Sequence, residues 1–146
     1  MKLQDLVVAT VDNPSNAAEW SLAEMINQPK IFDKAREELD HVVGWQERLS
    51  AGTGDRLVKE SDLPKLNYIK ACAKESLRLH PIAPFNVLDK SSKDLVVGGY
   101  FIPKGSQVLL SHHGLGHNLR VWEEKLKYKL ERHINGDQDT DEQWRS

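Results

Sequence analysis

The run Lys-Glu-Ser-Leu-Arg-Leu-His-Pro at residues 74–81 limits most strongly how this chain can fold. It predicts a helix over residues 65–80 that ends at the proline, because proline lacks the backbone N–H that a further turn needs. Glu75 and Arg78 stand three residues apart, so their side chains can pair on one helix. A surface pair has little energetic value, whereas a buried pair needs further hydrogen bonds. Arg132 could complete such a network.

The pattern before this run predicts two more helices. Apolar residues recur at helical spacing over residues 2–27, with a break expected at Asp12-Asn13-Pro14. The reason is that Pro14 removes one backbone donor and crowds the preceding turn. Asp12 could simply cap the restarted helix, as aspartate often does. Pro29 opens the second helix, which the pattern carries to residue 44, and residues 45–56 have the composition of a loop.

After residue 84 the pattern changes to that of a sheet. The runs 95–97 and 100–102, rich in β-branched and aromatic residues, flank Gly98-Gly99. They favour a small antiparallel sheet within residues 95–110. Short helical turns are expected after residue 120, and the polar tail 135–146 is expected to be disordered. The sequence therefore predicts a mainly α fold with a small antiparallel β-sheet.

Composition excludes several classes of protein. The net charge is −2 and the basic residues are dispersed, so we expect no nucleic-acid partner. The single cysteine, Cys72, excludes an internal disulfide framework and is expected to pack as a buried thiol. No run reaches the roughly 18 apolar residues that span a bilayer. We therefore expect no membrane segment in this chain and a soluble or cytoplasmic location.

Three histidines close in sequence, His112, His113 and His117, raise the question of a metal site. On a helix, His113 and His117 could share a face and bind a metal ion. However, Gly114 and Gly116 weaken any helix there, and no carboxylate or cysteine completes a set of ligands. The sequence therefore predicts no metal site.

In their order and spacing, these motifs resemble the cytochrome P-450 family. Glu75-x-x-Arg78 matches a pair that is near-universal in that family, and Leu-Glu-Arg-His at 130–133 resembles its later Pro-Glu-Arg-Phe/His segment. Ala-Thr-Val-Asp-Asn-Pro at 9–14 aligns with the kinked central helix on the oxygen side of the haem. Asn-Pro in place of two threonines, together with runs 81–87 and 99–105, is similar to the plant branch that N-hydroxylates amino acids to aldoximes.

The resemblance implies a partial haem-thiolate fold over residues 1–134 and a haem-dependent monooxygenase. Its substrate would be an amino acid, its electrons would come from an NADPH-dependent reductase, and full-length relatives would sit at the endoplasmic reticulum membrane. The resemblance also assigns site residues: an oxygen-side set of Asp12, Asn13 and Pro14, and a structural core network of Glu75, Arg78 and Arg132.

The chain also departs from the family pattern. The haem-binding loop Phe-x-x-Gly-x-Arg-x-Cys-x-Gly is absent, and Cys72 lies in the Glu-x-x-Arg helix, so the cofactor-binding residues are unknown. Asp89 stands where the branch usually has a histidine near a haem propionate, and two carboxylates would repel. We expect a truncated chain that does not retain haem and is catalytically silent. The alternative is a non-catalytic helical fragment, either a pseudogene product or a partner-binding remnant.

Overall fold

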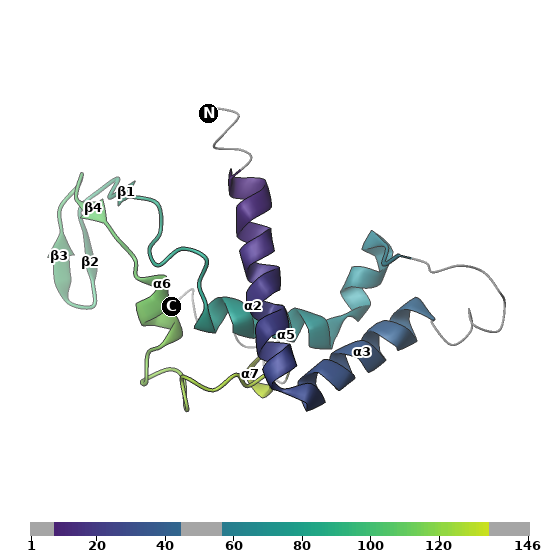
Figure 1. Ribbon diagram of the computed structural model, residues 1–146. Helices are drawn as coiled ribbons and strands as arrows, with labels where there is room; N and C mark the ends of the chain where they lie inside the picture. Colours follow the sequence, from purple (N-terminus) through teal and green to yellow (C-terminus); the bar gives the residue numbers. More distant parts are fainter. Residues whose placement is uncertain (1–7, 45–56, 135–146) are drawn as a thin grey trace. The chain divides into compact units, whose positions relative to one another are not determined.

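The computed structural model describes residues 8–44 and 57–134 (Figure 1). The described residues divide into two compact units. The first comprises those up to Leu77 together with those from Lys127 onward, and the second is Arg78–Leu126. Helix α5, Asn67–Leu79, begins in the first unit and ends in the second.

The first unit opens with a helix that changes its winding at the predicted break. Residues Val8–Asp12 form a π-helix, η1, and the α-helix α2, Asn13–Asn27, follows directly. Pro14 stands in the first turn of α2, where its missing N–H costs least. The hydroxyl of Ser15 donates a 2.7 Å hydrogen bond to the backbone carbonyl of Val11. A backbone acceptor at the junction of η1 and α2 is thus satisfied by a side chain.

Helix α3, Pro29–Val43, begins at a proline as expected and ends at Gly44. Gly44 takes the left-handed conformation (φ 72°) that ends many helices. Figure 1 shows α2 and α3 as consecutive helices joined by a sharp turn. The predicted loop at 45–56 lies outside the described residues. The chain resumes before a short 3-10 helix, η2, Glu60–Lys65, which precedes α5.

The start of α5 is held by a residue from another helix. The Glu38 carboxylate of α3 accepts hydrogen bonds from the backbone N–H groups of Tyr68 (2.8 Å) and Ile69 (3.0 Å). These are donors that the first turn of a helix leaves without intrahelical partners. Asp62 of η2, which precedes α5, instead accepts a 2.9 Å hydrogen bond from the N–H of Lys59.

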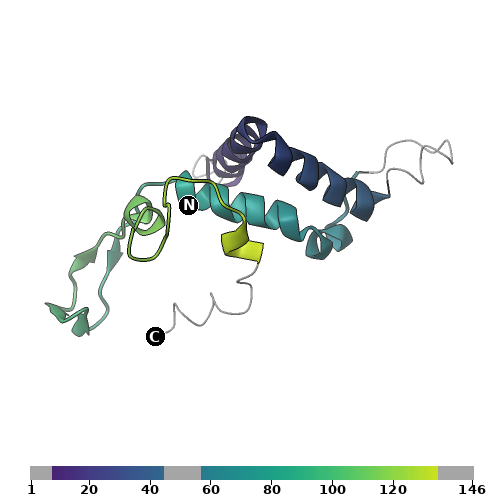
Figure 2. The ribbon, with the colours of Figure 1, turned by 90° about the horizontal axis from the view of Figure 1, so that it is seen from below.

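Among the described residues of the first unit, few apolar side chains are buried, and half of them are small. They come from α3, the residue before α5, α5 itself and the returning C-terminal segment: Ala35, Leu66, Ala71, Cys72, Tyr128 and Leu130. That segment ends in a single helical turn, α7, Glu131–Ile134. Figure 2 shows α7 beside α5, which brings residues about sixty positions apart in sequence into contact.

The second unit contains two separate two-stranded antiparallel ladders and a short helix. Strands β2, Leu95–Val97, and β3, Tyr100–Ile102, form the predicted hairpin. Both turn residues have positive φ, Gly98 at 57° and Gly99 at 83°, as a tight hairpin turn requires. Helix α6, His112–Gly116, follows the strands.

The second ladder was not predicted in this form. Strand β4, Gln107–Val108, pairs with β1, Asp89–Lys90, and not with the hairpin. The polar sequence of β1 carries no strand signal, so the prediction of one sheet within 95–110 was wrong in its pairing. The fold class, mainly α with small antiparallel β structure, is confirmed. The expected disordered tail at 135–146 lies outside the described residues.

None of the helices in the described ranges combines the length and the apolar character needed to cross a bilayer.

Candidate functional site

The predicted oxygen-side residues lie at the junction between η1 and α2. Asp12 has helical backbone angles (φ −67°, ψ −43°), and its side chain makes no capping hydrogen bond within the described residues. The simple capping role considered for Asp12 is therefore not what the structure shows. Asp12, Asn13 and Pro14 are all exposed. A carboxylate thus stands at the change of helical winding without serving the helix itself.

Glu75 is the centre of a buried polar cluster in the first unit. Its side chain is fully buried, although an ionised carboxylate without partners would be costly to remove from water. Its Oε1 lies 3.3 Å from Arg132 Nε and accepts a 3.0 Å hydrogen bond from the backbone N–H of Lys129. Its Oε2 accepts a 2.8 Å hydrogen bond from His133 Nε2. One carboxylate thus holds the returning C-terminal segment against α5.

The sequence pointed to Arg132 in this cluster but missed two other donors. The His133 ring was noted only as part of a motif, and the N–H of Lys129 has no sequence signature at all. Adjacent Arg132 and His133 both reach Glu75 because α7 is a tight helical turn. The sequence signal that could have identified His133 is its place directly after Arg132, which makes two neighbouring basic residues in one short helix.

Beside Glu75 lies a second buried group of hydrogen bonds. The Tyr128 hydroxyl donates to the backbone carbonyl of Cys72 at 2.8 Å and lies 3.1 Å from Ser76 Oγ. Ser76 Oγ donates to the same carbonyl at 2.9 Å. Burial raises the pKa of the Tyr128 hydroxyl, and the Ser76 hydrogen bond opposes this shift only in part. The hydroxyl therefore stays protonated and acts as a donor that ties Tyr128 to α5.

Arg78 belongs to the second unit and anchors a different segment. Its guanidinium donates to the carbonyls of Gly116 (2.6 Å) and Lys125 (2.8 Å). It also lies 5.3 Å from the centre of the Trp122 ring, within the range of a cation–π contact. Trp122 Nε1 in turn donates to the carbonyl of Leu115 at 3.0 Å. Arg78 thus links the end of α6 with the segment that leads out of the second unit.

Asp89, the acid expected near a haem propionate, is exposed in β1. Its Oδ2 accepts a 2.9 Å hydrogen bond from Asn86 Nδ2. The Asn86 side-chain oxygen accepts from the N–H of Leu110 at 2.6 Å. The acid therefore takes part in a hydrogen-bonded group of the second unit that connects β1 with the segment around Leu110.

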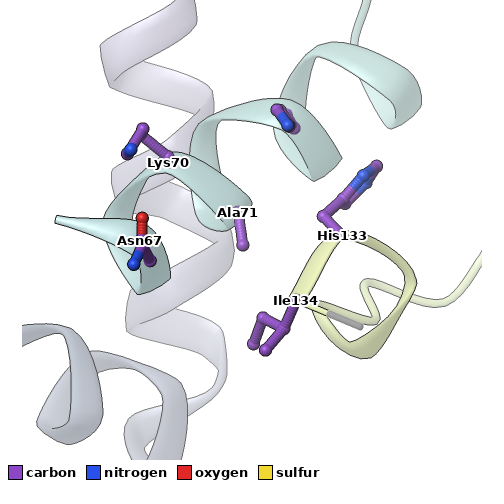
Figure 3. A pocket seen from close by; sticks show the side chains of 6 residues that line it. Asn67, Lys70, Ala71, His133 and Ile134 are labelled. Carbon is purple, nitrogen blue, oxygen red and sulfur yellow. The ribbon is translucent and has the colours of Figure 1, made fainter. Parts of the chain in front are cut away.

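A hollow of about 310 Å³ lies between α5 and α7. Figure 3 shows Ala71 of α5 facing His133 and Ile134 of α7 across it, with Asn67 and Lys70 at its edge. His133 lines this hollow and also binds Glu75, so the imidazole ring of His133 separates the buried carboxylate from the hollow.

No group of three or more His, Cys, Asp or Glu side chains within residues 8–44 and 57–134 is arranged to hold a metal ion. Cys72 is 1% exposed, and burial raises its pKa from 9.0 to about 11. It is therefore a protonated thiol near neutral pH. This state matches the buried packing role expected for it.

Comparisons with known proteins agree with one another. A family model described as Cytochrome P450 matches residues 1–144. The chain is 58% identical to a phenylalanine N-monooxygenase of Arabidopsis thaliana, over 92% of this chain and 24% of that protein. It is 57% identical to a phenylalanine N-monooxygenase of Prunus mume, over 93% and 24%, and 54% identical to valine N-monooxygenase 1 of Manihot esculenta, over 92% and 23%.

A solved structure gives the same result for the fold. A zebrafish cytochrome P450 determined with progesterone superposes with a TM-score of 0.74 at 26% identity, covering 89% of this chain and 29% of that one. The chain thus spans about a quarter of the length of the curated relatives that it matches.

Proposed function

Because the chain belongs to the cytochrome P450 family, we propose that it is part of a haem-dependent monooxygenase that N-hydroxylates an amino acid toward an aldoxime. The observation that carries this proposal is the likeness, at 53–58% identity, to amino-acid N-monooxygenases. Those relatives are named for phenylalanine, valine, tyrosine and tryptophan, so the proposed substrate is an amino acid as a class. An NADPH-dependent reductase would supply electrons at the endoplasmic reticulum membrane.

In this proposal Asp12, Asn13 and Pro14 shape the oxygen side of the site. The support is that the Asp12 carboxylate is exposed at a π-to-α junction and does not cap α2. Such a carboxylate can hold a proton and order water for its delivery. Positioned carboxylates contribute typically about 10²–10⁴-fold to proton transfer. Asp12→Asn should therefore lower aldoxime formation roughly a hundredfold and leave the unfolding free energy nearly unchanged.

The core network of the proposal is Glu75, Arg78 and Arg132. The support is that Glu75 draws the C-terminal segment of the first unit onto α5, while Arg78 ties α6 to the segment around Trp122 in the second. These contacts make α5 the helix on which each unit is anchored. Their role is structural and needs no direct contact with a substrate.

Haem is the cofactor of this family, and a cysteine thiolate is its iron ligand. Cys72 does not fit that task, because it is buried within α5, its carbonyl is engaged by Tyr128 and Ser76, and its pKa of about 11 keeps it a thiol. It is also the only cysteine of the sequence. We therefore propose that these 146 residues by themselves do not carry out the reaction.

Two measurements test the proposal. Carbon monoxide difference spectra of the purified, haem-supplemented chain should show no thiolate-type Soret band. Such a band would contradict the proposal that Cys72 does not bind the haem iron. The longest reading frame that contains these residues, expressed with a reductase and NADPH, should convert at least one amino acid to its aldoxime, measured by mass spectrometry. A thiolate Soret band without aldoxime from any protein amino acid would refute the assignment to N-hydroxylation.

The second candidate is a non-catalytic helical fragment. It is favoured by α2, which has no buried residue in the described structure and exposes Trp20, Leu22 and Ile26. Large apolar side chains exposed on a helix with no buried residue are typical of a surface that contacts a partner. A reading frame that yields no thiolate Soret band at all would favour this candidate over the enzyme.

A further inference from the structure

Two histidine rings stack on the outside of α6 in the second unit. The ring centres of His113 and His117 lie 4.1 Å apart with an angle of 29° between the ring planes. His113 lies within α6 and His117 directly follows its last residue, and the i, i+4 spacing brings the two rings to the same side. His113 is exposed and His117 is half-buried, so solvent and ions can reach the pair. No part of the proposed function uses either ring.

The orientation of His117 is already that of a metal ligand. Its Nδ1 lies 3.0 Å from the backbone carbonyl of His113. A carbonyl only accepts, so Nδ1 carries the hydrogen and Nε2 keeps its lone pair in the neutral ring. Metal-binding histidines commonly donate their second N–H to a backbone carbonyl in this way, which fixes the tautomer and the ring direction. The lone pair of His117 is thus held in place before any ion arrives.

The helix that carries the pair is held at both ends, despite its two glycines. Ser111 caps its start by accepting a 2.9 Å hydrogen bond from the N–H of Gly114. Arg78 binds the Gly116 carbonyl at its end. Gly116 packs so closely on the Arg78 carbonyl that an added Cβ would collide with it. The helix that the glycines were expected to weaken therefore forms and keeps the two rings in register.

We propose that His113 and His117 together form a binding site for a divalent transition-metal ion. Two nitrogens on one ion, each about 2.1 Å from it, lie roughly 3 Å apart, so binding would require the two stacked rings to turn until their nitrogens converge on the ion. No third His, Cys, Asp or Glu in the described residues joins them, so water would complete the coordination. Imidazole ligands suit Cu²⁺, Ni²⁺ and Zn²⁺, and Cu²⁺ binds tightest in this series. This proposal is independent of the proposed enzyme function.

The test is calorimetric titration of the untagged 146-residue chain with Cu²⁺. Removing one of two linked ligands abolishes the gain from their proximity, so His113→Ala and His117→Ala should each weaken binding roughly a hundredfold. The matched control is His112→Ala. Its ring neighbours the pair in sequence but lies about 100° round the helix from His113, where its Nδ1 binds the carbonyl of Ala83. It is therefore not placed to share an ion with His113 and His117, and this variant should bind Cu²⁺ like the unaltered chain.

The proposal is overturned if either pair variant binds Cu²⁺ as tightly as the unaltered chain, or if His112→Ala weakens binding equally. Circular dichroism checks that each variant is folded. If a pair variant does not fold, electron paramagnetic resonance of the unaltered chain with one equivalent of Cu²⁺ decides. Hyperfine splitting from two imidazole nitrogens supports the site, and splitting from one or none refutes it.

Discussion

Glu75 of α5 and His133 of α7 are joined by a 2.8 Å hydrogen bond between Oε2 and Nε2. The carboxylate is fully buried, whereas the ring is 12% exposed at the edge of a hollow. Together with Arg132 on the other carboxylate oxygen, this bond means that a charged group, and not apolar packing alone, holds the C-terminal segment on α5.

Arg132→Met should therefore destabilise the chain by about 3–5 kcal/mol, the usual cost of leaving a buried charge without its partner. The measurement is urea unfolding followed by circular dichroism. In an E75Q background, which removes the charge of Glu75, the same substitution should cost clearly less because the two residues are coupled.

The matched control is Arg36→Met in α3. Arg36 Nε lies 3.8 Å from Asp40, and its side chain is 70% exposed. An exposed pair of this kind contributes at most about 1 kcal/mol. Equal losses for the two arginine variants would show that Glu75 does not depend on Arg132.

Glu38→Ala should remove the cap that α3 provides for α5, at a cost of about 0.5–2 kcal/mol. The backbone N–H groups of Tyr68 and Ile69 donate hydrogen bonds to Glu38. In the variant these N–H groups should exchange hydrogen faster as the first turn of α5 frays. The neighbouring Glu37→Ala removes an exposed carboxylate from the same helix and should leave this exchange unchanged. Unchanged exchange in Glu38→Ala would rule out the cap.

The sequence predicts those features that have a local physical cause. Pro14 forces the break before α2, and Gly98-Gly99 allows a tight hairpin turn. Features that depend on distant residues were missed. Glu38 caps a helix thirty residues later, and the two polar residues of β1 form a strand only because β4 lies opposite them.

The candidate site shows the same division. Asp12, Glu75 and Arg132 were proposed from motifs, and of these Glu75 and Arg132 lie in contact. The donors His133 and the N–H of Lys129 depend on how α7 turns toward α5. A shared helical face for His113 and His117 was considered and set aside, because the glycines between them argue against a helix. In the structure the helix forms because Ser111 caps its start and Arg78 binds the carbonyl at its end, contacts that the apolar pattern does not reveal.

Alkaline pH should destabilise the chain through Cys72. Its pKa is raised from 9.0 to about 11 by burial, so the folded state holds its thiol proton more tightly than the unfolded state does. Stability from this group is complete below pH 9 and is lost as the pH rises through 11, up to about 3 kcal/mol at 1.36 kcal/mol per pKa unit. Unfolding free energies measured across this range should fall less in Cys72→Ala. An equal fall in both proteins would exclude the thiol as the cause.

Gly116→Ala should destabilise the second unit by about 1–3 kcal/mol, the typical cost of forcing an extra methyl group into a packed site. The added Cβ would collide with the backbone carbonyl of Arg78, which cannot turn aside as a side chain can. In Gly114→Ala the nearest atom is the Ser111 hydroxyl oxygen at 3.0 Å, and this side chain can shift. A helix gain of up to about 1 kcal/mol should then offset the crowding, so urea unfolding of Gly114→Ala should stay close to that of the unaltered chain. If both alanine variants unfold at the same urea concentration, α6 does not pack on α5 through Gly116.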